Sequence, residues 1–524
     1  MKDSHGFSNP RVVAAATAAV AVLGVVATPA QAAETKAPKN IIYMIGDGMG
    51  YNHVAAVNLW QTGQSKWMLN GENSINSISN VDGKPVQAFE QEDKGWKHTS
   101  MTTFQYGNEY DEIKAWSDRE WINKNFTDSA AAATAMGTGV KTDNGKIGVD
   151  HKGEKLENVS QRAAAQGKAA GVVSSVPFNH ATPAGWGGHN ENRSNYTQLA
   201  DEMLGPDSPL SVIMGAGHPL YDDNAQKTDK FNPKYITEET YNKVANGETD
   251  WRLVTDQADF ESLAKAANKD AKKVFGLAPV ANTLQQGRDG SDGEDKANVG
   301  PYLTEFNKGV PSLATMSLGA LNTLNQDEDG FHLMIEGGAI DWTGHANTIG
   351  RSIEETIDFF DAVAAVEKWV EANSSWEDTL LIVTADHETG YLAGPQDPSK
   401  YSELSGEKGA KPEHTYNSDN HTNQLVGFWY KGAGAGDIYE ASTKHTDKIR
   451  GSYIDNTTVA RLTLDKWWNG EKPADDTKPD DGSSADSPWL IAILSILGVA
   501  GLLAVIAQAA PSLVDNLRGQ FAKF

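Results

Sequence analysis

Short apolar runs alternate with amphipathic segments between about residues 39 and 468. Uninterrupted apolar runs are typical of strands that are buried on both faces of a sheet. Between the last two runs, apolar residues recur at helical spacing from Ile353 to Val370. The alternation predicts an α/β fold, with strands at residues 41–45, 171–174, 212–214, 332–335 and 380–384.

The segment from about 60 to 121 shows neither the unbroken apolar runs of buried strands nor the helical spacing of apolar residues. It is rich in Asn, Gly, Glu and Trp, and its apolar positions are irregular. We expect an insertion or a surface subdomain here, within a catalytic body that spans residues 33–468.

The N-terminus has the pattern of an export signal. Lys2 and Arg11 precede a largely apolar run over residues 12–27, and Ala30-Gln31-Ala32 has the small-x-small pattern at which signal peptidases cut. Residues 1–32 are therefore predicted to be a cleaved signal peptide. An uncleaved N-terminal anchor is the alternative.

A second apolar segment lies near the C-terminus. No charged residue occurs from 489 to 507, which is long enough to cross ~30 Å of hydrocarbon as a helix. An acidic linker of Pro, Asp and Ser, residues 469–488, precedes it, and Arg518 and Lys523 follow it in a tail of residues 508–524. Because positive residues stay in the cytoplasm, the sequence predicts an exported protein that is anchored to the cell membrane with its catalytic body outside.

Composition and charge exclude several classes of protein. The 524 residues include no cysteine, so disulfide scaffolds, cysteine zinc fingers and cysteine nucleophiles are ruled out. Hydrophobic residues make up 39% and charged residues 22%, as in globular proteins. Lys and Arg number 45 against 70 Asp and Glu, a net charge of −25. This acidity repels phosphate backbones, so we expect no nucleic acid as a specific partner.

Acidic residues and histidines follow three of the predicted strands. One aspartate in a glycine-rich turn is ordinarily a turn former, but turn chemistry does not explain the repetition. Asp341 and His345 are four residues apart, one helical turn, so their side chains can converge on one ion. Mixed carboxylate and imidazole ligands suit Zn²⁺. The residues in question are Asp47, Glu336, Asp341, His345, Asp386 and His387.

Ser129 is a candidate nucleophile. An alanine run over residues 130–133 predicts a helix that starts directly after it. A helix N-terminus holds a phosphoryl group against free backbone N–H groups, and a nearby metal lowers the pKa of a hydroxyl. Taken alone, Asp128 or Ser129 is more readily explained as a helix N-cap.

Five motifs in this order and approximate spacing resemble the alkaline phosphatases. The likeness covers roughly residues 39–466. It implies a three-layer α/β/α sandwich around a large, mostly parallel sheet, here with surface insertions and a C-terminal transmembrane helix. The motifs are Gly46-Asp47-Gly48-Met49-Gly50, Thr127-Asp128-Ser129-Ala130-Ala131, Glu336-Gly337-Gly338-Ala339-Ile340-Asp341, Thr384-Ala385-Asp386-His387 and Asn420-His421-Thr422.

The resemblance also implies roles for individual residues. Two zinc ions and one magnesium ion are expected, with Ser129 as the nucleophile and Arg193 as the clamp on the phosphate. The first zinc would be held by Asp341, His345 and His421, the second by Asp47, Asp386 and His387, and the magnesium by Asp47, Thr182 and Glu336.

Two positions depart from the best-known bacterial pattern. His180 stands where some members have an aspartate, and Trp342 stands where some have a lysine near the phosphate. Replacing an aspartate with His180 removes an anionic group near the third metal. This change should weaken the preference for magnesium, so the identity of that metal is left open.

The expected function is hydrolysis of phosphate monoesters through a phosphoserine intermediate. The alternatives are a phosphodiesterase, a phosphonate hydrolase or a sulfatase with the same metal core, or a surface protein that holds metal or phosphate without turnover. Small phosphate monoesters and the membrane are the expected partners, and a homodimer is left open.

Overall fold

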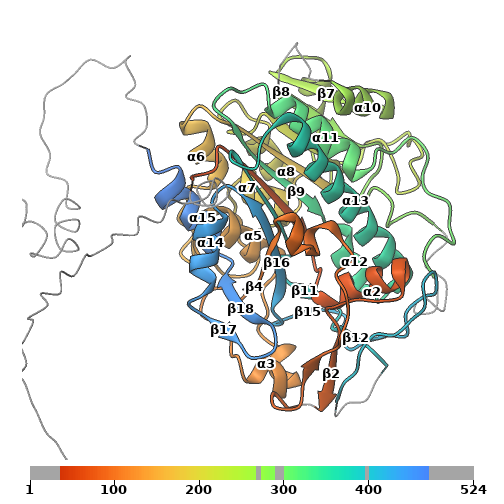
Figure 1. The fold of residues 1–524 in the computed structure, drawn as a ribbon. Helices are drawn as coiled ribbons and strands as arrows, with labels where there is room; N and C mark the ends of the chain where they lie inside the picture. The colour runs from red at the N-terminus through yellow and green to blue at the C-terminus, as the bar shows by residue number, and fades with distance from the viewer. Residues whose placement is uncertain (1–35, 73, 267–272, 290–299, 396–399, 471–524) are drawn as a thin grey trace, which may run out of the picture. The chain divides into compact units, whose positions relative to one another are not determined.

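The computed structural model describes residues 36–72, 74–266, 273–289, 300–395 and 400–470 (Figure 1). Its main feature is one large mixed sheet with helices packed against it. The strands are, in order across the sheet, β17 (Thr446–Asp447), β18 (Gly451–Asp455), β4 (Lys97–Thr102), β16 (Val426–Gly432), β10 (Thr379–Thr384), β1 (Asn40–Gly46), β9 (Phe331–Gly337), β5 (Ala169–Pro177), β6 (Val212–Ala216), β8 (Lys273–Leu277) and β7 (Trp251–Val254).

The pairing from β10 to β7 is parallel throughout, whereas β16 is antiparallel to both β10 and β4. The five predicted strands all exist, as β1, β5, β6, β9 and β10, and the α/β prediction is confirmed. In register, Ile45 of β1 lies beside Glu336 of β9 and Thr384 of β10. The carboxyl ends of these three strands therefore lie together, where ligands bind in open α/β sheets.

Helices pack beside the strands in two groups: α13 contacts both α11 and α2, and α5 contacts both α7 and α15. The longest helix, α13, includes the predicted helical residues 353–370. The helices are α2 (Tyr51–Thr62), α3 (Lys114–Ser117), α4 (Arg119–Ile122), α5 (Ser129–Thr138), α6 (Val159–Ala165), α7 (Ala181–Gly187), α8 (Tyr196–Met203), α9 (Glu238–Ala245), α10 (Gln257–Lys265), α11 (Leu313–Leu324), α12 (Ala339–His345), α13 (Ile349–Asn373), α14 (Ala435–Ser442) and α15 (Thr458–Arg461).

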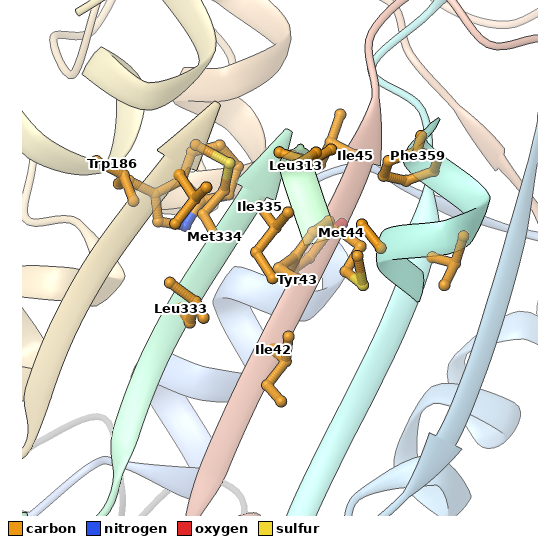
Figure 2. Close-up of a cluster of buried hydrophobic side chains, with 14 of the residues drawn as sticks. Ile42, Tyr43, Met44, Ile45, Trp186, Leu313, Leu333, Met334, Ile335 and Phe359 are labelled. Carbon is orange, nitrogen blue, oxygen red and sulfur yellow. The ribbon is translucent and has the colours of Figure 1, made fainter. Parts of the chain in front are cut away.

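Side chains of the central strands form the core (Figure 2). Every residue of β1 and β9 is buried, because neighbouring strands and helices cover both faces. The Tyr43 ring of β1 lies 5.9 Å from the Trp186 ring of α7, and Gly337 of β9 lies close to Phe359 of α13. This packing fixes the strand ends that carry the acidic residues.

Only part of the 60–121 segment stands apart from the main sheet, because β4 is one of its strands. The rest includes β2 (Leu69–Glu72) and β3 (Ser79–Asn80), which form a small sheet with β13 (Lys400–Tyr401). A separate apolar cluster holds this part together, and its buried members are Leu69, Ile78, Ala115, Trp116 and Ile449.

Several predictions for the chain ends fall outside the described residues. These are the signal peptide over residues 1–32, nearly all of the 469–488 linker, the transmembrane helix over 489–507 and the 508–524 tail. Within the part of the chain that the structure describes, no helix is both long enough and apolar enough to cross a membrane.

Candidate metal and phosphate site

The loop after β1 places Asp47 at the end of the central strand. Gly48 has a positive φ of 76°, which favours glycine. A Cβ atom at this position would lie 2.8 Å from both Cα of Asp341 and Oγ1 of Thr389. The loop can therefore lie against α12 and the segment after β10 only because residue 48 has no side chain.

Asp341, His345 and His421 converge although they come from different segments. Asp341 and His345 lie on α12, and His421 lies on β15 (His421–Thr422). Oδ1 of Asp341 is 3.4 Å from Nε2 of His345 and 3.3 Å from Nε2 of His421, and the two Nε2 atoms are 3.2 Å apart. Three ligand atoms this close together can hold one metal ion.

Backbone carbonyls orient both of these histidines. Nδ1 of His345 donates to the carbonyl of Asp419 at 2.7 Å, and Nδ1 of His421 donates to the carbonyl of Thr127 at 2.8 Å. These bonds place the proton on Nδ1 and turn Nε2 toward Asp341. Such outer hydrogen bonds are the usual support of histidine ligands in metal sites.

The charges in this group compensate one another. Burial alone would raise the pKa of Asp341, but hydrogen bonds from His345 and His421 hold this pKa well below its usual range. Burial would lower the pKa of His345, and the Asp341 carboxylate instead raises it to about 9. A cation bound here would replace the protons that the histidines carry.

A second group adjoins the first and is fully buried. Nε2 of His387 lies 3.0 Å from Oδ2 of Asp386 and 3.6 Å from Oδ1 of Asp47. The backbone N–H of Gly48 donates to Oδ1 of Asp386 at 3.0 Å. Asp47, Asp341 and His387 also present ligand atoms close enough for one ion, so Asp341 lies between the two groups.

Ser129 is the first residue of α5 and faces the second group. Its Oγ lies 3.3 Å from Nε2 of His387. Asp128 caps the helix by accepting from the N–H of Ala131 at 2.9 Å. The helix cap and the candidate nucleophile are thus adjacent residues, and the serine hydroxyl is left to face the candidate metal ligands.

Arg193 reaches the same place from another segment. Its Nη1 donates to Oδ2 of Asp128 at 3.0 Å, and the N–H of Gly145 donates to the same oxygen at 3.0 Å. Asp128 therefore holds the guanidinium beside Ser129, where its other N–H groups can bind phosphate oxygens.

Buried oxygen atoms mark a third candidate site. Both carboxylate oxygens of Asp47, Oε1 of Glu336 and Oγ1 of Thr182 are buried without a hydrogen-bond partner among the described residues. Burial raises the pKa of Glu336 to about 7, and burial together with Asp386 raises the pKa of Asp47. Such oxygen donors fit a hard cation, which would satisfy the orphaned atoms and restore the charged carboxylates.

His180 and Trp342 lie side by side near this third group. Their rings are 5.7 Å apart and tilted by 63°. Burial, with a further contribution from Arg193, lowers the pKa of His180 to about 3, so the imidazole is neutral at physiological pH. Nδ1 of His180 is buried and without a hydrogen-bond partner in the described structure.

The sequence analysis did not single out Thr389. Oγ1 of Thr389 lies 2.6 Å from Oδ1 of Asp341 and 3.2 Å from Nδ1 of His387. A signal was available, because Thr389 is two residues after His387 and alternate residues of an extended segment share a face. Its contact with Asp341, in contrast, depends on the fold.

Comparisons with known proteins identify the family of this chain. The sequence model of the alkaline phosphatase family matches residues 93–460, more than half of the chain. The chain therefore belongs to the alkaline phosphatase family.

Individual relatives are moderately similar. Alkaline phosphatase 4 of Bacillus subtilis (strain 168) is 30% identical over 357 residues, covering 67% of this chain and 62% of that protein. Alkaline phosphatase of Escherichia coli (strain K12) is 29% identical over 375 residues, covering 67% of this chain and 70% of that protein. The match spans less than two thirds of the length of the Bacillus relative.

A solved structure shares the fold. The alkaline phosphatase from the Antarctic bacterium TAB5 superimposes with a TM-score of 0.52 at 22% identity, covering 82% of this chain and 98% of that protein. Structures of two of its variants, in which a histidine is replaced by glutamate or aspartate, have magnesium bound in a site named M3.

Proposed function

We propose that this protein hydrolyses phosphate monoesters to an alcohol and inorganic phosphate through a phosphoserine intermediate. The observation that carries the proposal is the position of Ser129, whose Oγ lies 3.3 Å from Nε2 of His387. His387 belongs to one of two adjoining groups of candidate metal ligands. A nucleophile at the N-terminus of a helix and beside two metal groups suits phosphoryl transfer.

The net charge of the site argues for bound cations. A phosphate monoester dianion is repelled by carboxylates, and Asp47, Asp341 and Asp386 are all buried here. Arg193 is the cationic side chain held next to Ser129, and one guanidinium does not offset a phosphate dianion beside these carboxylates in the ionised form that binds metal. The site therefore requires metal ions before it can bind its substrate.

We assign two zinc ions to the mixed carboxylate and histidine groups. Asp341, His345 and His421 would hold the first, and the second would lie among Asp47, Asp386, His387 and Ser129. When bound, zinc supplies Lewis-acid chemistry, which lowers the pKa of hydroxyl groups and stabilises developing alkoxide charge.

The residues of the chain then have distinct tasks. Oγ of Ser129 releases its proton to solvent and forms a bond to phosphorus while the bond from phosphorus to the ester oxygen breaks, and the alcohol takes a proton from solvent as it leaves. Water then loses a proton and bonds to phosphorus, the bond from phosphorus to Oγ breaks, and Oγ regains a proton as inorganic phosphate is released. Arg193, held by Asp128, binds two phosphate oxygens in both steps.

We assign the third cation to Asp47, Thr182 and Glu336, with magnesium as the expected ion. His180 stands close to this group and is neutral, so it adds no anionic charge that would favour magnesium. The TAB5 variants that bind magnesium carry an acidic residue in place of a histidine. We infer that zinc competes with magnesium at this third site.

A comparison of three ester classes tests the proposed activity. The purified, zinc-loaded protein is assayed with p-nitrophenyl phosphate, a bis-p-nitrophenyl phosphate diester and a p-nitrophenyl sulfate ester. We expect kcat/KM to be highest for the monoester. A higher value for the diester or the sulfate would replace the monoesterase proposal, and no turnover of any ester would favour a binding protein.

We also propose export and membrane anchoring, on the pattern of the two chain ends. Every proposed ligand precedes residue 422, so a cut within residues 469–488 should release an active catalytic body. Intact cells are treated with a protease that cannot enter them, and activity is assayed in the supernatant and the pellet. Activity that stays in the pellet after the linker is cut contradicts the anchor.

A further inference from the structure

Thr389 lies at the junction of the two candidate zinc groups. It is fully buried and belongs to β11 (Glu388–Thr389), where it pairs in register with His421. Its Oγ1 lies 2.6 Å from Oδ1 of Asp341 and 3.2 Å from Nδ1 of His387. One hydroxyl therefore contacts a proposed ligand of the first zinc and a proposed ligand of the second.

The direction of both hydrogen bonds follows from the chemistry of the groups. The ionised carboxylate of Asp341 can only accept, so the hydroxyl proton of Thr389 points to Asp341. The hydroxyl oxygen must then accept from His387, which requires a proton on Nδ1. Nε2 of His387 is left without a proton, and this atom faces Asp386, Asp47 and Ser129.

The surrounding backbone keeps Thr389 in this place. Its N–H donates to the carbonyl of Gly48 at 3.0 Å, which ties it to the loop that carries Asp47. A Cβ atom at Gly48 or Gly344 would lie within 3.0 Å of Thr389 atoms. Because residues 48 and 344 are glycines, the loop after β1, helix α12 and the segment after β10 can pack closely around Thr389.

We propose that Thr389 is a positioning residue that couples the two zinc groups energetically. An ion at Asp341 fixes the orientation of that carboxylate, which fixes the hydroxyl and the tautomer of His387 that the second ion needs. The coupling is reciprocal, so each ion raises the affinity for the other. This inference rests on the zinc sites proposed above.

Zinc binding by three variants tests the coupling directly. Thr389→Val has nearly the same shape without the hydroxyl, Thr389→Ser keeps the hydroxyl, and Thr356→Val is the control. Thr356 is equally buried, but its hydroxyl donates to the carbonyl of Ser352 within α13. Bound zinc is measured by elemental analysis after equilibration at buffered free zinc concentrations.

We expect wild type, Thr389→Ser and Thr356→Val to take up the first two zinc equivalents in one steep transition. In Thr389→Val the transition should broaden, with affinity for at least one equivalent lowered by about 10-fold to 100-fold. An unchanged transition in Thr389→Val would overturn the proposal. Equal losses in Thr389→Ser and Thr389→Val would also overturn it, because packing and not the hydroxyl would then be responsible.

The tautomer of His387 provides a second measurement, which a change of packing at residue 389 would not alter by itself. In protein labelled with ¹⁵N-histidine, the His387 signals are assigned by their loss in His387→Gln. We expect a proton on Nδ1 in zinc-loaded wild type, and mixed tautomers in partly loaded Thr389→Val. A single Nδ1–H tautomer in that variant contradicts the coupling, whereas a wild type that binds no zinc refutes the underlying zinc sites instead.

Discussion

Gly50 lies directly against the buried side chain of Glu388. A Cβ atom on Gly50 would be 2.3 Å from Cγ of Glu388 and 3.0 Å from its Cβ. Gly50 is also the N-cap residue of α2. The start of α2 and the side chain of Glu388 are therefore packed so closely that only glycine fits at position 50.

We expect Gly50→Ala to lower the free energy of unfolding by about 1–3 kcal/mol, because the added methyl group must displace Glu388 or α2. Urea unfolding of the metal-free protein measures this change. Gly300→Ala is the matched control, since a Cβ atom there would meet nothing within 4 Å. Equal stability of the two variants would contradict the close contact.

Glu388 should make stability depend on pH. Burial raises the pKa of Glu388 from 4.5 to about 7, against hydrogen bonds from Thr422 and the N–H of Leu392 that lower it. Between these pH values the folded protein holds a proton that the unfolded chain releases, so stability falls as pH rises through this window. The loss amounts to at most about 3 kcal/mol.

Glu388→Gln removes the titrating group and should flatten this dependence. Urea unfolding of the metal-free proteins at pH 5 and pH 8 gives the comparison. We expect a smaller decrease of the unfolding free energy in Glu388→Gln than in wild type. The same decrease in both proteins would show that Glu388 titrates normally.

Ser129→Ala should abolish the covalent intermediate. Turnover of a phosphate monoester should fall by roughly 10³-fold or more, since only direct attack by water remains. Zinc content should stay near that of wild type, because the other ligands come from other segments. Trapping phosphoprotein at acidic pH with a ³²P-labelled ester checks the intermediate.

Ser160→Ala is the control for this substitution, because Ser160 is a buried serine near the start of α6. It should keep both turnover and phosphoprotein. Normal turnover in zinc-loaded Ser129→Ala would remove Ser129 from the mechanism.

Removal of metal should lower thermal stability as well as activity. Zinc that binds only the folded state stabilises it by about 2.7 kcal/mol at a free concentration 100 times Kd. We expect a chelator to lower Tm and added Zn²⁺ to restore it.

His345→Gln should lose one zinc equivalent, whereas His414→Gln should lose none, since His414 lies outside both ligand groups. Full activity with no measurable metal would refute the metal assignment.

The central strands could be predicted from the sequence because they are buried on both faces and read as unbroken apolar runs. β4 could not, since its sequence, Lys97-His98-Thr99-Ser100-Met101-Thr102, is mostly polar although four of its residues are buried. Hydrogen bonds such as that from Oγ1 of Thr99 to the carbonyl of Ser452 satisfy these side chains. This partner is 353 residues away in the chain and leaves no local pattern.

The candidate site likewise contains contacts that the sequence predicts and contacts that only the fold creates. Asp341 and His345 are visible as a pair because one helical turn separates them. The sequence does not predict Thr389 as a partner of Asp341, because their contact depends on how β11, α12 and the loop at Gly48 pack. Sequence motifs therefore predicted the candidate metal ligands, and the fold was needed to find the hydroxyl that contacts two of them.

The sheet order has a consequence for the synthesis of the chain. β1 is made first, but its neighbours are made much later, since Phe331 of β9 follows Asn40 by 291 residues and Thr379 of β10 follows it by 339. At 5–20 residues per second, the ribosome needs about 15–60 s to reach β9. During this time β1 has neither of its neighbouring strands, so its apolar side chains cannot yet be buried in the sheet, and the site can assemble only after β9 and β10 have been made.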